Sequence, residues 1–306
     1  MNRVATRGNY QAALLNLMQA QKRGQVAQQQ FASGKVGTSH GEFGRVSETI
    51  TAMRTTQTRT SGFLDTAKTT ADRLNSQDLA MDRIASSATD ARNAIANALA
   101  AGRSEGLMTE LRSLFQAVQD GVNAKHQGKY LFSGGAVETV PSSVGGLDAL
   151  AALPNVDDVF KNDNLIQSSW VDENITLETG FLAKNLGTEL YEIFRDIAVF
   201  EQNTPMNGIL SEPQKTFLTA QISRLDKAAE KVVTMQAANG AIQARVDTMI
   251  ETHIKRADTL EVMLAEKTDA DMAKAVTELE LSEIAIQASA QVISQLRQTS
   301  LLDYLR

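Results

Sequence analysis

Two long segments of this 306-residue chain repeat apolar residues in alternating steps of three and four. In the first, from about residue 45 to 101, eleven of the fifteen positions reached from Ile50 are apolar. In the second, ten of the fourteen positions reached from Leu218 are apolar. This spacing is typical of helices that pack lengthwise against one another. A helix of fifty residues is about 75 Å long, so we expect the two segments to fold back on each other as a rod.

Proline is scarce and lies outside the interiors of both segments. The four prolines fall at positions 141, 154, 205 and 213, and the last follows Ser211, which suits a helix start. A further helix is predicted from about residue 106 to 127. The positions expected to form the core of the rod are Ile50, Leu64, Leu74, Met81 and Ile95 in the first segment and Leu225, Val232, Ile242, Val246 and Met249 in the second.

The middle of the chain has a different pattern. No helical period persists between residues 130 and 180, apart from a short helix expected near 147–153, and Ser, Gly, Asn and Asp are frequent. Short runs at 165–166, 169–171 and 175–177 predict strands separated by turns. The predicted class is mainly α, a long antiparallel helical bundle or coiled-coil rod with a small β-containing insert. We predict three parts: residues 1–44 with 270–306, residues 45–133 with 181–269, and the insert 134–180.

The two ends of the chain are amphipathic segments that are too short to be stable helices alone in water. We expect them to be poorly ordered in an isolated subunit and helical once they pack against neighbours. They would form an inner assembly domain. The predicted assembly residues are Leu14, Leu17 and Met18 near the start and Ile286, Ile293 and Leu301 near the end.

The residues offer little for catalysis or for cofactor and metal binding. Cysteine is absent, and His40, His126 and His253 lie far apart in sequence without a paired ligand. The Gly-Lys pair at 128–129 is followed by Tyr, where a phosphate-binding loop requires Ser or Thr. The net charge is −6 with both signs interspersed, which disfavours nucleic acid binding. No run is apolar enough for a membrane span or a signal peptide, so we expect neither. The chain is predicted not to be an enzyme.

Four stretches of sequence resemble the flagellin family. Residues 28–35 read Gln-Gln-Gln-Phe-Ala-Ser-Gly-Lys, similar to a stretch near the start of that family's chains. Residues 128–134 read Gly-Lys-Tyr-Leu-Phe-Ser-Gly and resemble a motif of its hook-associated members. Residues 269–276 and 298–305 resemble the C-terminus of those members. The loop 37–43 departs from the family pattern, which has paired acidic residues and proline there.

The resemblance implies a structural subunit of the bacterial flagellum at the hook–filament junction. It further implies export as an unfolded chain through the flagellar type III apparatus, and a final location outside the cell. The implied partners are further copies of the same chain, a neighbouring hook-associated protein, flagellin, and an export chaperone that covers the C-terminal segment.

Two alternatives remain open from the sequence. A filament flagellin would share the terminal helices, although the Tyr-Leu-Phe-Ser-Gly segment and the Leu-Leu-Asp-Tyr-Leu ending favour the junction. A cytosolic coiled-coil adaptor would share the heptads and the lack of cysteine, but would leave the motif at 128–134 unexplained.

Overall fold

The computed structural model describes residues 2–302, and the side chains of residues 8–39 and 41–296. About 75% of the chain is helical, and two small antiparallel sheets make up the strands. The mainly α class with a small β insert is therefore confirmed. The chain divides into two compact units, one from residues up to Arg59 and from Arg256 onward, the other from Thr60 to Lys255. The division into three parts predicted above stays a prediction.

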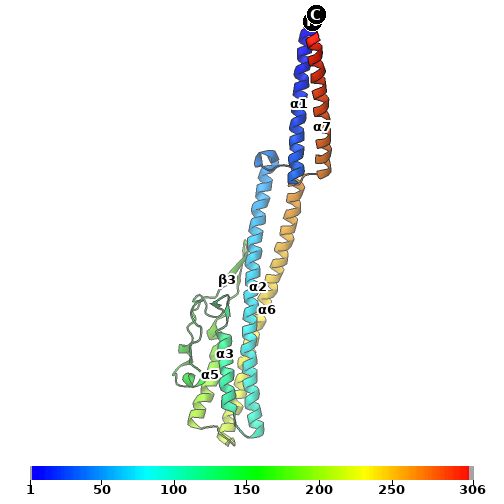
Figure 1. Cartoon of the computed structure of the whole chain (residues 1–306). Coiled ribbons are helices and arrows are strands. Elements are labelled where there is room, and N and C mark those ends of the chain that lie inside the picture. Colours follow the sequence, from blue (N-terminus) through cyan, green and yellow to red (C-terminus); the bar gives the residue numbers. More distant parts are fainter. Residues whose placement is uncertain (1, 303–306) are drawn as a thin grey trace. The chain divides into compact units, whose positions relative to one another are not determined.

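The first unit contains the helices at both ends of the chain. These are α1 (Asn2–Ser33) and α7 (Met272–Leu302), which lie side by side and antiparallel (Figure 1). The unit also contains the 3-10 helix η1 (His40–Val46), the first turns of α2 (Ser47–Ala101) and the last turns of α6 (Glu212–Thr268). The segment 40–46 is helical around a kink at Gly44, which has a positive φ of 52°.

A short backbone clamp joins the segment after α1 to the segment before α7. The Val36 amide donates to the Thr268 carbonyl at 2.7 Å, and the Ala270 amide donates to the Gly34 carbonyl at 2.9 Å. Between these bonds, the ammonium of Lys35 pairs with the carboxylate of Asp269. The clamp thus joins two of the stretches that resemble the flagellin family.

The second unit holds the remaining elements. They are the middle and end of α2, α3 (Leu107–Val122), β1 (Lys125–His126), β2 (Lys129–Tyr130), α4 (Leu147–Ala151), η2 (Val156–Val159), β3 (Ser168–Asp172), β4 (Ile175–Glu178), α5 (Ala183–Asn203) and most of α6. Strands β1 and β2 form one antiparallel hairpin, and β3 and β4 form the other. The loops after α2 and after α5 meet, since the Leu210 amide donates to the Gly102 carbonyl at 2.9 Å.

One hydrophobic core joins α2, α3, α5 and α6 of the second unit to much of the insert. At its centre, the ring of Phe115 contacts Tyr191 at 5.0 Å and Phe194 at 5.5 Å between centroids. Phe160 of the insert packs on Tyr191 from another side at 5.1 Å. Burial raises the pKa of the Tyr191 hydroxyl, which shares a hydrogen bond of 2.8 Å with Ser142. The insert is therefore packed into the helical core and is not a free appendage.

The apolar period of the long helices holds over most of their length. All fifteen expected positions of α2 are buried or half-buried, as are those of α6 from Leu218 to His253. Beyond His253 the expected pattern is wrong at Arg256 and Met263, which are exposed, while Leu260 is half-buried as expected and Leu264 is buried in place of Met263. His253 and Leu264 are eleven residues apart, close to three turns of a straight helix, whereas strict heptads drift from that period.

Two local predictions were also wrong. Helix α3 ends at Val122, five residues earlier than expected, because Gln127 and Gly128 adopt positive φ angles of 49° and 82° that turn the chain into the β1–β2 hairpin. The run at 165–166 is outside the strands, while β3 and β4 confirm the other two. The expected helix at 147–153 is present as α4.

The close approach of α3 to α2 requires glycine at position 121. A Cβ on Gly121 would lie 2.6 Å from Cγ1 of Ile84 and 3.1 Å from the Ala80 carbonyl oxygen. We predict that Gly121→Ala lowers the free energy of unfolding by about 1–3 kcal/mol through overpacking. Gly62→Ala on α2 is the control, since its Cβ would meet nothing within 4 Å. That change should raise stability by about 0.5–1 kcal/mol. Urea unfolding followed by circular dichroism measures both, and equal effects would contradict the close contact.

The clamp should loosen in acid. The hydrogen bond from Lys35, followed by that from Thr268, lowers the pKa of Asp269 below its ordinary value. Because the folded pKa is lowered, the stabilisation is complete above the unfolded pKa of about 4 and is lost as the pH falls through the folded value. We predict that protection of the Val36 and Ala270 amides from hydrogen exchange falls across this range. In Asp269→Asn, the protection of these amides should already be low at pH 7 and should not change with acid. If this variant shows the wild-type dependence of protection on pH, the ion pair does not stabilise the clamp.

Candidate functional site

The two terminal helices meet through small side chains. Ala20 and Ala27 of α1 and Ala275 of α7 are buried. A Cβ on Gly24 would lie only 2.7 Å from the Ser282 hydroxyl of α7, so the two backbones approach closely there. Small residues at such a contact allow close packing but bury little apolar area. Beside these small residues, Leu17 of α1 and Leu279, Ile286 and Ile293 of α7 are half-buried.

Many other large apolar side chains lie on the outer surfaces of α1 and α7. The most exposed is Ile284 at 62%, followed by Leu15 and Met18 at 58% each. The exposed large apolar residues of the two helices are Tyr10, Leu14, Leu15, Met18, Val26, Phe31, Met272, Val276, Leu281, Ile284 and Val292. Scattered apolar residues are normal on a protein surface, but so many on one helix pair indicate an interaction surface.

The predicted assembly residues fall partly on this surface. Leu14 and Met18 are exposed, while Leu17, Ile286 and Ile293 are half-buried. The side chain of Leu301 lies outside the described residues. Leu15, Phe31 and Ile284 were missed, although their size and the amphipathic pattern around them could have indicated them. The role of all these residues in assembly stays a prediction.

The residues expected in the rod core are all at least half-buried. Ile50, Leu74, Met81, Ile95, Leu225, Val232 and Val246 are buried, and Leu64, Ile242 and Met249 are half-buried. Most of them contribute to the two clusters of the second unit.

The motif at 128–134 has a structural explanation in the second unit. Phe132 is fully buried, and its carbonyl accepts the Ala183 amide at the start of α5 at 2.8 Å. The following Gly134 has a φ of 70°, and a Cβ there would collide with the Asp163 carboxylate. That carboxylate also accepts the Gly135 amide at 2.7 Å. The motif thus anchors the start of the insert in the core.

The histidines have structural contacts where their side chains are described. His253 is fully buried, its Nε2 lies 2.7 Å from the Val171 carbonyl oxygen, and its ring stacks on Phe63. It thereby fastens β3 to α6. The Nδ1 of His126 lies 2.8 Å from the Ser76 hydroxyl. The side chain of His40 lies outside the described residues.

Among the described residues, no three His, Asp or Glu side chains gather as metal ligands. None of the described helices is both long and apolar enough to span a membrane.

Comparison with known proteins points in one direction. Residues 222–305 match the family described as the bacterial flagellin C-terminal helical region. A protein of Vibrio parahaemolyticus described as a flagellar hook-associated protein has a similar structure, with a TM-score of 0.60 and 17% identity over 73% of this chain and 97% of that one. FlgL of Bacillus cereus gives a TM-score of 0.55 and 13% identity over 68% and 96%. No curated protein sequence matches the chain at a significant level.

At these identities the two structures establish the fold, and the sequence match establishes the C-terminal region. The resemblance read from the sequence is thereby confirmed: the chain carries a flagellin C-terminal helical region and has the fold of FlgL and of a flagellar hook-associated protein.

Proposed function

We propose that this protein is a structural subunit of the bacterial flagellum, placed at the hook–filament junction and assembled through its terminal helices. The observation that carries the proposal is the set of large apolar side chains left exposed on α1 and α7. The flagellin C-terminal match and the fold shared with FlgL support the flagellar setting. The exposed apolar side chains of the terminal helices support a role in assembly rather than in catalysis.

A single chain has no further element that covers these side chains on the described helix pair. Neighbouring copies could cover them, with different faces of α1 and α7 meeting so that subunits add head to tail. Apolar burial contributes roughly 25 cal/mol per Å², less the cost of ordering the segments. Assembly would therefore order segments that are weakly stable in an isolated subunit.

The finer assignments follow from sequence. The motif at 128–134 and the Leu-Leu-Asp-Tyr-Leu ending favour the junction over the filament. We further propose export through the type III apparatus, with a chaperone on the C-terminal segment, and an extracellular location beside another hook-associated protein and flagellin. A filament flagellin is the second candidate, supported by the match at residues 222–305.

The first test uses a double variant, Leu15→Asp combined with Ile284→Asp. These are the two most exposed aliphatic residues of α1 and α7. We expect this double variant to fold its second unit normally, with an unchanged main thermal transition, and to be absent from purified flagella. A charge at these positions would be costly to bury in a neighbour. Ile209→Asp is the matched control, since Ile209 is 84% exposed and belongs to the second unit.

Incorporation of the double variant at the wild-type level would count against assembly through the terminal helices. If both the double variant and the control are absent from flagella, incorporation is sensitive to added charge in general, and α1 and α7 have no specific role. Immunoblots of sheared flagella, normalised to cellular protein, measure all three proteins.

The second test locates the protein. Immunogold labelling of intact flagella should give one short zone between hook and filament. Label along the whole filament, together with filaments formed by the purified chain alone, would favour the flagellin alternative. Label confined to the cytosol would support the adaptor.

A further inference from the structure

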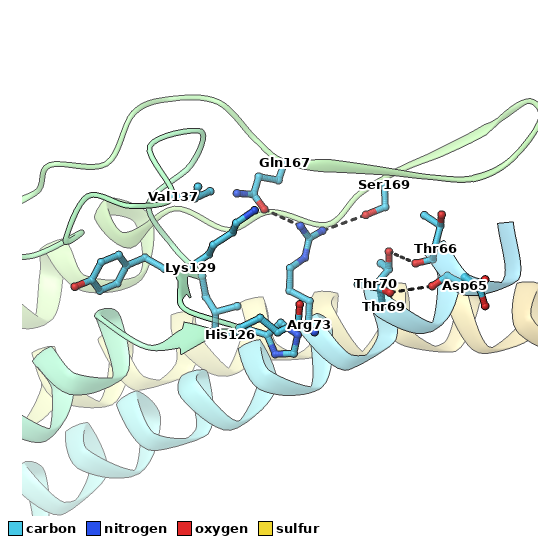
Figure 2. Close-up of a pocket in the computed structure, with 13 residues that line it drawn as sticks. Asp65, Thr66, Thr69, Thr70, Arg73, His126, Lys129, Val137, Gln167 and Ser169 are labelled. Carbon is cyan, nitrogen blue, oxygen red and sulfur yellow. Dashed lines mark hydrogen bonds between the residues drawn. The ribbon is translucent and has the colours of Figure 1, made fainter. Parts of the chain in front are cut away.

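A cavity of about 480 Å³ lies between α2, the β1–β2 hairpin and the start of β3 (Figure 2). All of its lining residues belong to the second unit. Its volume is within the range of about 300–1,000 Å³ that is typical of ligand pockets. Tyr130, Leu131 and Val137 form apolar walls, and the polar lining includes Arg73, His126 and Lys129.

Arg73 is a half-buried cation without a carboxylate partner. Its guanidinium donates to the Gln167 side-chain oxygen at 2.7 Å, to the Ser169 hydroxyl at 3.2 Å and to the Thr179 hydroxyl. A guanidinium has five N–H donors, so two are left, one of them on the buried Nε. Burial lowers the pKa of Arg73 below its ordinary value. Its positive charge is therefore balanced by no acidic group among the described residues.

Two further polar groups line the same cavity. Lys129 extends from β2 toward Gln167, and its ammonium forms no ion pair or hydrogen bond with any described residue (Figure 2). The Nε2 of His126 is buried without a hydrogen-bond partner in the described chain. Lys129 is exposed, whereas the unpaired Nε2 of His126 and Nε of Arg73 are buried. Unpaired buried polar atoms are costly, and a ligand that pairs with them recovers that cost.

The only acidic side chain in the lining is Asp65, at some distance from the cations. It precedes Arg73 by eight residues on α2, which is about 12 Å along a helix. This exceeds the screening length of about 8 Å at physiological salt. Asp65 therefore leaves the end of the cavity near Arg73 and Lys129 positively charged.

We propose that this cavity binds a carboxylate carried on a short carbon chain. Arg73 and Lys129 would hold the oxygens by charge-assisted hydrogen bonds, and the apolar walls would contact the carbon chain. The carboxylate has two possible sources, a free small acid or an acidic side chain of a second copy of this acidic protein. The site does not depend on the flagellar role proposed above.

Trp170 provides a built-in probe of the cavity. It is the one tryptophan of the chain, and it follows Ser169, which accepts a hydrogen bond from Arg73. Its indole is 59% exposed, contacts Phe63 edge-on and donates to the Glu173 carbonyl at 3.2 Å. A change in how Arg73 holds β3 should therefore alter the emission of Trp170.

The experiment titrates the dilute full-length protein with succinate in a chloride buffer of constant ionic strength. Trp170 fluorescence and calorimetry both follow the titration. We expect saturable binding that Lys129→Gln weakens by about tenfold, since it removes a charged donor. Lys68→Gln is the matched control, because Lys68 is an exposed lysine of α2 outside the cavity lining. Arg73→Gln should abolish binding, and its unfolding curve checks that β3 remains in place.

A second arm identifies the source of the carboxylate. Sedimentation velocity over a range of protein concentrations, with and without succinate, compares the same variants. Self-association that succinate inhibits, that Lys129→Gln and Arg73→Gln reduce and that Lys68→Gln leaves unchanged would assign the site to a second copy. Succinate binding without such association would assign it to a free acid. The absence of both, or equal affinity in wild type and Lys129→Gln, would overturn the proposal.

Discussion

The contact between α1 and α7 covers only one face of each helix. Ala20, Ala27 and Ala275 are buried, and Leu17, Ile286 and Ile293 are half-buried. Leu15, Phe31 and Ile284 are left on other faces of the same helices. The pair is consequently a poor folding unit by itself and a good surface for further helices. Under the proposed function, neighbouring copies of the subunit would cover that surface.

The second unit has the opposite character. Its core combines long helices, the shorter α3 and α5, and insert residues such as Leu150 and Phe160. The aromatic rings around Phe115 and Tyr191 fill the space among α3, α5 and the insert. Its core is built from residues of this unit alone and does not include α1 or α7. The same separation makes charged substitutions on α1 and α7 informative, since they leave the main core intact.

Much of this architecture could be predicted because it is periodic or local. The apolar steps of three and four from Ile50 to Leu99 give α2 directly, and residue-type signals give β3 and β4. What could not be predicted depends on contacts between distant residues. Gly134 is required because Asp163 folds over it, and the cavity at Arg73 joins residues from α2, two hairpin strands and β3. The change of period after His253 has no signal in heptad counting, which assumes one constant repeat.

An apolar seam rich in alanine does not by itself fix how two long helices align, because a shift by one heptad keeps apolar residues in contact. Strand β3 resolves this ambiguity, because it bonds to both helices. The Nε2 of His253 on α6 lies 2.7 Å from the Val171 carbonyl oxygen, and Arg73 on α2 donates to the Ser169 hydroxyl at 3.2 Å. A shift of one helix by a heptad would break one of these contacts. Asn239 of α6 is fully buried in the same seam, where its side-chain amide donates to the Leu74 carbonyl at 3.0 Å.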